Sequence, residues 1–175
     1  GIILPRINID DWLIEAKENA TEDEIKGQRE ERITTFGTLV HKTLEDKIRG
    51  IDGDYSSFFK GEKERGRIIN EALRLRDSFF NSSFYIQTLK GFSLLPERSF
   101  MIRDGENIVE GVIDLFAEKD DEIFIVDYKT DSLKVESDHK NQLNYYREAV
   151  KTIYPEKRIR AAVFYLRDPE NILEI

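Results

Sequence analysis

The sequence contains no cysteine. This absence excludes a disulfide framework, a thiolate zinc site, a cysteine-held iron–sulfur cluster and a cysteine nucleophile. A chain without disulfides fits a reducing compartment. Long hydrophobic runs are also absent: no apolar stretch approaches the ~20 residues that span a bilayer, and the opening GIILP is too short for the apolar region of a signal peptide. We therefore expect a soluble, cytoplasmic protein with no membrane partner.

An excess of positive charge is lacking as well. The chain has 27 Lys and Arg against 35 Asp and Glu, a formal net charge of -8. Such a balance disfavours binding of nucleic acid by the surface as a whole, because phosphates attract basic surfaces. The bases are nevertheless concentrated in residues 60–76, and a local basic face can coexist with an acidic total. Lys63, Arg67 and Arg74 lie there at helical spacing, so they form either a phosphate-contacting face or a solvated helix surface.

Apolar spacing predicts helices in the first half of the chain. A short helix is expected over 8–17, capped by Asp10 or Asp11, followed by a polar stretch that reads as a linker or an exposed turn. A clear helix follows over roughly 31–49, where Gly50 is placed to end it, and a second over about 62–80. We expect residues 1–30 to be an N-terminal helix with a linker-like segment, and 31–175 to be one domain.

The apolar period then changes from helical to alternating. Three consecutive strands are predicted over 92–102, 107–118 and 122–129, with Asp104-Gly105 and Asp120-Asp121 as two-residue hairpin turns. A helix over 138–154, a nearly continuous apolar strand over 158–166 and a last short strand at 171–175 complete the pattern. This order predicts an α/β fold in which helices flank a mixed sheet made of a three-strand meander, a helix and a strand.

Two aspartates interrupt neighbouring strands of this meander. With Asp120-Asp121 as the turn, Asp114 lies directly opposite Asp127, with Cβ atoms roughly 4.5–5.5 Å apart. Lys129 shares the face of Asp127 because side chains alternate along a strand. Two carboxylates so close repel unless a cation offsets them, and hard oxygen ligands suit Mg²⁺ or Mn²⁺. The alternatives are solvated acids at strand ends, or a one-residue slip that separates the two faces.

A histidine on the first long helix is the third element of this hypothesis. Gly37, His41 and Glu45 recur at steps of four and share one stripe of the helix. His41 supplies a nitrogen ligand if the helix crosses the acid pair; otherwise it is a structural or exposed histidine. A mid-helix glycine costs up to ~1 kcal/mol against alanine, and close approach of another backbone would explain Gly37.

Three further polar residues are candidates for the same site. With Asp104-Gly105 as a turn, Glu97 lies opposite Val112 on the face of Asp114, either as an outer-shell or second-metal ligand or as a surface residue. Gln142 and Tyr146 lie one turn apart on the helix after the strands. Taken alone, that pair reads as a surface amide beside a packed aromatic.

Five short stretches together resemble the RecB-type nuclease family of the PD-(D/E)XK superfamily: GTLVH, PERSF, GVIDLF, IVDYKTD and QLNYY, in this order over about 37–166. The resemblance implies a restriction-endonuclease-like fold and Mg²⁺-dependent hydrolysis of DNA phosphodiesters, with Mn²⁺ as a substitute. It implies that His41, Asp114, Asp127 and the Tyr128 carbonyl surround the metal and that Lys129 is the catalytic lysine. Gln142 and Tyr146 match the motif that supports the lysine and the DNA backbone, and Glu97 matches a family acid.

Many members of this family are C-terminal nuclease domains of RecB-like or AddA-like helicase–nucleases. The resemblance therefore implies an exodeoxyribonuclease V-like exonuclease acting on linear double- or single-stranded DNA, in double-strand-break repair or DNA degradation. ATP dependence would come from a helicase module in the same full-length chain, and a further partner would be a second subunit, although no G-x-x-x-x-G-K-[ST] loop occurs here. The alternatives are a stand-alone phage-like exonuclease or endonuclease, and an inactive nuclease fold that binds DNA or another protein subunit.

Overall fold

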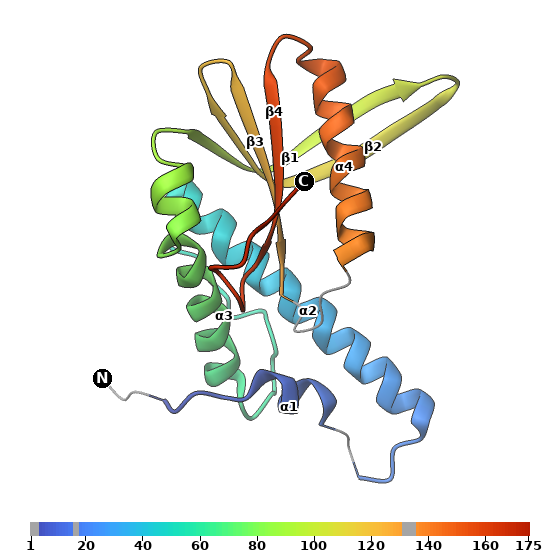
Figure 1. Ribbon diagram of the computed structural model, residues 1–175. Helices are drawn as coiled ribbons and strands as arrows, with labels where there is room; N and C mark the ends of the chain where they lie inside the picture. Colours follow the sequence, from blue (N-terminus) through green and yellow to red (C-terminus); the bar gives the residue numbers. More distant parts are fainter. Residues whose placement is uncertain (1–3, 16–17, 131–135) are drawn as a thin grey trace.

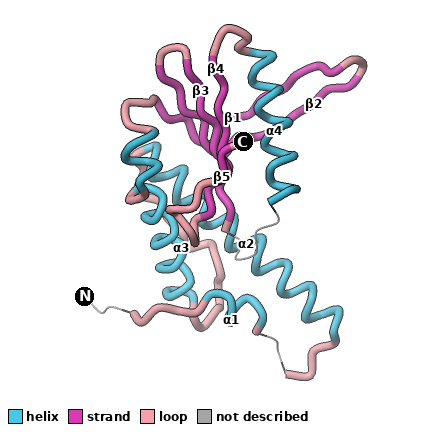
Figure 2. Tube along the Cα trace, viewed as in Figure 1, coloured by secondary structure: helices cyan, strands magenta, loops and turns pink. Residues whose placement is uncertain are grey.

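The computed structural model describes residues 4–15, 18–130 and 136–175. Its first half holds three helices, α1 (Ile9–Ile14), α2 (Glu22–Arg49) and α3 (Arg65–Phe80), followed by a short π-helical turn, η1 (Phe84–Thr88), which sequence periodicity does not indicate. A five-stranded sheet and one further helix make up the second half (Figures 1 and 2). None of the described helices is long and apolar enough to cross a bilayer.

Helix α2 begins nine residues before the expected start near residue 31. Thr21 caps it: the Thr21 hydroxyl accepts a hydrogen bond from the Glu24 backbone N–H, and the Glu24 carboxylate accepts one from the Thr21 N–H. This reciprocal capping box starts the helix inside the polar stretch, so the expected linker or exposed turn is helical from Glu22 onward. The expected end is confirmed, because Gly50 adopts the left-handed conformation with φ 69°.

The N-terminal segment packs onto the rest of the molecule. Asn8, not Asp10 or Asp11, caps α1 by accepting a hydrogen bond from the Asp11 backbone N–H. Trp12 is buried against Phe59 and lies below the guanidinium of Arg32. The helix expected over 8–17 is shorter than predicted, and residues 16–17 lie outside the described part of the chain.

The sheet has the predicted order of strands. A meander of β1 (Ser93–Asp104), β2 (Asn107–Lys119) and β3 (Glu122–Lys129) is followed by α4 (Glu136–Ile153), which returns the chain to β4 (Arg158–Tyr165). Strand β4 pairs in parallel with β3, and the short β5 (Leu173–Glu174) pairs with β4 at the edge. All pairs other than β3 with β4 are antiparallel, so the mixed sheet flanked by helices is confirmed.

Helices cover both faces of the sheet (Figure 1). Phe124, Val126 and Tyr128 of β3 point into a core shared with α2, α3 and the N-terminal segment. The alternate residues Ile123 and Ile125 point into a second core with α4. Because both faces of β3 and β4 are covered, these strands read as continuous apolar runs in the sequence.

The two hairpin registers differ in how well the sequence predicts them. Between β2 and β3, Lys119 pairs with Glu122 and Leu115 with Val126, which confirms the Asp120-Asp121 turn. Between β1 and β2, Asp104 pairs with Asn107, so the turn is Gly105-Glu106 and the predicted Asp104-Gly105 turn is wrong. The register shifts by two residues, and Ser99, not Glu97, lies opposite Val112.

Candidate active site

A cleft opens where strands β2 and β3 part. Their ladder ends at Leu115 and Val126, and the next residues are Asp114 and Asp127. The cleft has a volume of about 580 Å³, with α2, β1, β2, β3, α4 and Thr130 as its walls. Its lining comprises Ile33, Thr34, Gly37, Thr38, His41, Lys42, Glu45, Glu97, Val112, Asp114, Asp127, Tyr128, Lys129, Thr130, Gln142 and Tyr146.

Asp114 is held from two sides. Its Oδ2 accepts a hydrogen bond of 2.9 Å from the backbone N–H of Tyr128, and its Oδ1 lies 3.4 Å from Nδ1 of His41. Burial by itself would raise the pKa of Asp114, but hydrogen bonds and the charge of His41 outweigh burial and lower this pKa below its usual value. Asp114 therefore remains a carboxylate, the form that binds a hard cation.

Asp127 shows the opposite behaviour in the same cleft. Burial and the neighbouring charge of Asp114 raise the pKa of Asp127 to about 7, against the pull of Lys129, whose Nζ lies 3.0 Å from Oδ2. Two carboxylates this close do not both ionise readily without a cation between them. The pair expected from the hairpin register is thus present as a strongly interacting pair.

His41 reaches the acids from α2. Burial lowers the pKa of His41, but hydrogen bonds and charges of Asp114 and Glu97 outweigh it and raise this pKa to about 10. The imidazole ring also meets the edge of the Tyr128 ring, with centroids 5.8 Å apart. The carboxylates of Asp114 and Glu97 therefore favour the imidazolium form of His41, whose single positive charge partly offsets theirs.

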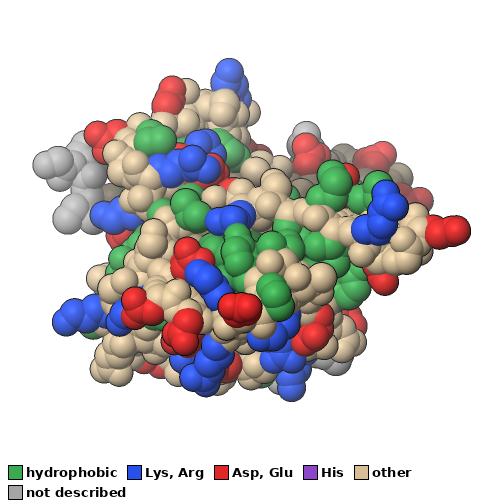
Figure 3. All heavy atoms as spheres, turned by 90° about the horizontal axis from the view of Figure 1, so that it is seen from above, with side chains coloured by type: hydrophobic (Ala, Val, Ile, Leu, Met, Phe, Trp, Pro, Cys, Tyr) green, Lys and Arg blue, Asp and Glu red, His purple; other side chains and the backbone are tan. Residues whose placement is uncertain are grey.

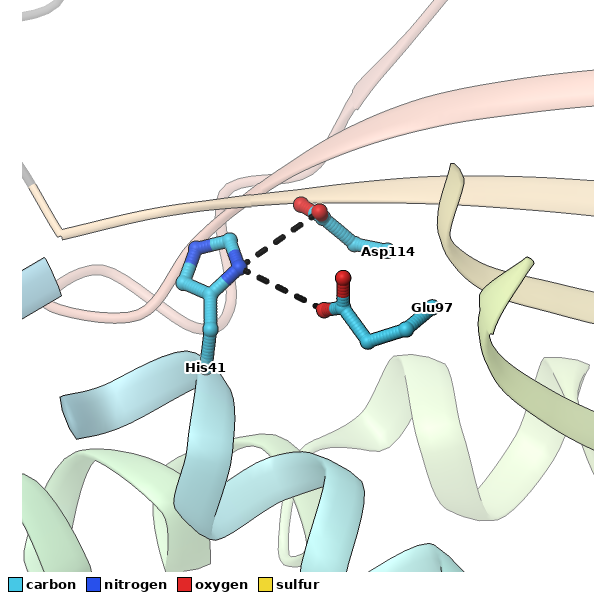
Figure 4. Close-up of side chains that lie close together, drawn as sticks. All are labelled: His41, Glu97 and Asp114. Atoms are coloured by element: carbon cyan, nitrogen blue, oxygen red, sulfur yellow. Dashed lines mark ion pairs between the residues drawn. The ribbon is translucent and has the colours of Figure 1, made fainter. Parts of the chain in front are cut away.

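Glu97 comes from the opposite wall, at a kink in β1. Its φ of 51° lies in the left-handed region that non-glycine residues rarely adopt, and the ladder between β1 and β2 skips this residue. The kink turns the carboxylate toward His41, with Oε1 3.9 Å from Nδ1 (Figure 4). Backbone strain of this kind concentrates at functional sites.

These three residues form a set of metal-ligand atoms. One donor atom each from His41, Glu97 and Asp114 lies within 4.8 Å of the others, and Figure 4 shows the three side chains converging. Among the described residues, this is the group whose donor atoms lie that close together. The sequence placed Asp127 with His41 and Asp114, and left Glu97 as an outer-shell or second-metal ligand or a surface residue. The structure brings Glu97 into the cluster and places Asp127 beside it, paired with Lys129.

The remaining predicted residues divide into two groups. Gln142 and Tyr146 line the cleft from α4, where the Tyr146 ring packs edge-on against Phe100 with centroids 5.1 Å apart. Gly37 faces the cleft, but a Cβ there would meet the Thr130 hydroxyl at an ordinary 3.6 Å. Among the described residues, no backbone atom of another segment lies within 4 Å of that Cβ position, so the expected close approach is not found there.

Lys63, Arg67 and Arg74 are not part of the cleft lining. Arg67 donates hydrogen bonds to the backbone carbonyls of Pro5 and Arg6 and pairs with Glu64. Arg74 pairs with the buried Glu71 at 2.6 Å. Two of the three bases are thus already occupied in fixing the N-terminal segment and α3, and their contact with DNA stays a prediction.

Sequence reasoning missed part of the cleft wall. Ile33 extends the stripe of Gly37, His41 and Glu45 by one further helical step, so the same four-residue spacing could have found it. Val112 shares its face with Asp114 because it lies two residues away on the same strand. Thr130 follows directly after Lys129 inside the stretch IVDYKTD, so that stretch marks its position although no role was assigned to it.

Comparison with known proteins gives a family match. A model described as the PD-(D/E)XK nuclease superfamily matches residues 11–173. The chain is 21% identical over 176 residues to an ATP-dependent helicase/nuclease protein of Staphylococcus carnosus, covering 82% of this chain and 14% of that protein. It is 27% identical over 110 residues to the RecBCD enzyme subunit RecB of Chlamydia muridarum, covering 55% and 11%. A Vibrio cholerae protein of known crystal structure matches with TM-score 0.40 and 18% identity, over 86% of this chain and 37% of that one.

Proposed function

The chain belongs to the PD-(D/E)XK nuclease superfamily, and from this premise we propose that it hydrolyses DNA phosphodiester bonds with the help of a divalent cation, Mg²⁺ or Mn²⁺. The observation that carries the proposal is the convergence of His41, Glu97 and Asp114 beside the pair Asp127 and Lys129. Carboxylate oxygens with a single imidazole nitrogen suit such cations, so the residues present fit the ion.

The charge of the cleft supports the need for a cation. The cleft is lined by four carboxylates, those of Glu45, Glu97, Asp114 and Asp127. The basic side chains in its lining are those of Lys42, Lys129 and His41. A DNA phosphate entering this acidic cleft would be repelled unless positive charge is added. His41 supplies one such positive charge when no metal is bound. A divalent ion would replace this charge after His41 loses its proton.

Each proposed catalytic residue has a distinct task. Asp114, Glu97 and His41 would hold the cation, joined by Asp127 and the Tyr128 carbonyl. Bound there, such an ion would supply a lowered pKa of a water molecule and positive charge beside the phosphoryl group. Lys129 is directed to this point by Asp127 and would orient the water or stabilise the phosphoryl oxygens. Gln142 and Tyr146 would position Lys129 and the DNA backbone from α4.

The relatives support a proposal about the full-length setting. The chain spans at most 14% of the two curated proteins described above, whose names are those of a helicase/nuclease and of RecB. We propose that residues 31–175 act as the nuclease unit of a comparable protein, exodeoxyribonuclease V-like, cytoplasmic and dependent on ATP through a helicase module. Linear DNA would be its substrate, in double-strand-break repair or DNA degradation, and a second subunit its partner. Helicase motifs in the full-length sequence would distinguish this setting from a stand-alone nuclease.

Cleavage of labelled linear DNA tests the activity. Wild type should cleave with Mg²⁺ or Mn²⁺ and not in EDTA, whereas Asp127→Ala should lose at least about 100-fold in rate, because Asp127 directs Lys129 and balances the cation. Glu156→Gln, an exposed acid outside the cleft, serves as the matched control and should cleave as wild type does. Cleavage in EDTA, or by Asp127→Ala at the wild-type rate, would reject the mechanism.

A further inference from the structure

The hairpin of β1 and β2 continues beyond the part of the sheet where β2 pairs with β3. This extension is a projecting arm, residues 99–112 (Figure 1). One face of the arm packs toward α4: Phe100 is buried there, and Ile102 and Val109 are partly buried against the same core. Phe100 pairs with Gly111, where an added Cβ would come within 2.6 Å of the Phe100 ring. The α4 face of the arm is therefore packed closely at Phe100 and partly covered beyond it.

The opposite face of the arm carries three exposed apolar side chains. Val112, Met101 and Ile108 lie on this face with 46%, 63% and 61% of their surfaces exposed. Met101 pairs with Glu110, so it is a diagonal neighbour of both Val112 and Ile108, at roughly 7–8 Å. The three side chains form one continuous band, the apolar strip, and exposed apolar groups that adjoin one another mark contact surfaces.

The apolar strip starts inside the cleft. Val112 lines the cleft and precedes Asp114 by two residues, while Met101 and Ile108 lie successively farther out along the arm. In the view from above, hydrophobic side chains gather where the lobe on the right, formed by the arm, joins the body (Figure 3). The strip therefore leads outward from the place where the scissile phosphate would lie.

The charges beside the strip help to identify what it contacts. Its polar neighbours on the same face are Ser99, Arg103 and Glu110, which hold one base and one acid. This face has no net charge to attract a phosphate backbone. A DNA strand whose phosphate lies at the cation site has a second, apolar part, the faces of its bases, and only an unpaired strand exposes them.

Building on the proposed function, we infer that the apolar strip contacts the nucleobases of an unpaired DNA strand whose phosphate occupies the cleft. The strip then holds the strand without reading its sequence, because every base presents an apolar face. The strip is continuous with the cleft, and this favours DNA as its occupant. A DNA strand that leaves Asp114 beside Val112 and stays on the arm passes over Met101. The salt dependence of binding should come from the cleft and not from the strip.

The test measures binding separately from cleavage. The double variant Met101→Ser/Ile108→Ser is compared with Ile51→Ser/Ile86→Ser, which replaces two similarly exposed isoleucines outside the cleft and the strip. Fluorescence anisotropy of a labelled unpaired oligonucleotide, with Ca²⁺ in place of Mg²⁺, gives Kd. We expect the strip variant to raise Kd about tenfold with an unchanged salt slope, and the control pair to bind as wild type does.

A second substrate separates the strip from the proposed function. Bis(p-nitrophenyl) phosphate with Mn²⁺ lacks nucleobases and reports on the cation site alone. The ratio of kcat/KM for the oligonucleotide over this small diester should fall about tenfold in the strip variant, through KM. Wild-type protein that cleaves neither substrate contradicts the proposed function. A strip variant with wild-type Kd and a wild-type ratio overturns the strip inference while leaving the proposed function standing.

Discussion

Two halves of the same cleft treat their carboxylates differently. On the α2 side, His41 keeps Asp114 ionised and lowers its pKa. On the β3 side, burial and Asp114 raise the pKa of Asp127 to about 7 although Lys129 is 3.0 Å away. A histidine beside an acid therefore prepares a ligand, while an acid beside another acid leaves a group whose ionisation near neutral pH is incomplete and is favoured by a nearby cation. We call the α2 side, with His41 and Asp114, the holding half, because it is suited to holding the ion. The β3 side, with Asp127 and Lys129, is the chemical half, because it is suited to the chemistry next to the ion.

The largest expected effect comes from removing the lysine of the chemical half. Lys129→Met should lower the rate of DNA cleavage about 100- to 1,000-fold, because the phosphoryl oxygens lose a positioned donor. Metal affinity, measured by titration calorimetry with Mn²⁺, should change less than about threefold, since Lys129 is not a ligand. Lys60→Met, an exposed lysine outside the cleft, should retain wild-type cleavage. Equal losses of metal affinity and rate would remove the distinction between the two halves.

The histidine of the holding half should make metal binding depend on pH. Because the pKa of His41 is raised to about 10, its imidazole is protonated near neutral pH and must lose a proton before its nitrogen can bind metal. Affinity for Mn²⁺ should therefore rise with pH, about tenfold per unit between pH 7.5 and 9, and level off near pH 10. His41→Gln should flatten this slope, whereas His139→Gln, at the other histidine of the chain, should keep it. A slope that persists in His41→Gln would show that another group releases the proton.

A smaller effect is expected from a glycine that positions Tyr146. A Cβ at residue 111 would meet the Phe100 ring at 2.5 Å and the Tyr146 ring at 3.1 Å, so both rings must move in Gly111→Ala. Because Tyr146 lines the cleft from α4, cleavage should fall about tenfold while Mn²⁺ affinity is retained. Gly105→Ala at the hairpin turn, where no atom crowds an added Cβ but the φ of 63° strains alanine, provides the comparison for a loss of stability alone. Loss of metal binding in Gly111→Ala would place the glycine in the holding half instead.

The sequence predicted the order of the strands and the register between β2 and β3, which ends just before Asp114 and Asp127, because apolar runs, the Asp120-Asp121 turn and side-chain alternation are local signals. It predicted His41 through helical spacing. It could not place Glu97 correctly, since that depended on choosing between Asp104-Gly105 and Gly105-Glu106 as the turn. The kink at Glu97 is a tertiary effect in which a residue without glycine's freedom adopts φ 51°. The early start of α2 was available from Thr21 and Glu24, which form the capping box.

The smallest expected effect isolates this kink. Glu97→Gly and Glu97→Ala both remove the carboxylate next to His41, but only glycine adopts a positive φ without strain. Left-handed backbone costs other residues roughly 1–2 kcal/mol, partly offset by the greater freedom of glycine in the unfolded chain. Denaturant unfolding without metal should therefore find Glu97→Gly more stable than Glu97→Ala by about 1 kcal/mol, while both variants bind Mn²⁺ equally weakly. If alanine proves as stable as glycine, the φ of residue 97 carries no strain, and the carboxylate alone accounts for the choice of glutamate in the holding half.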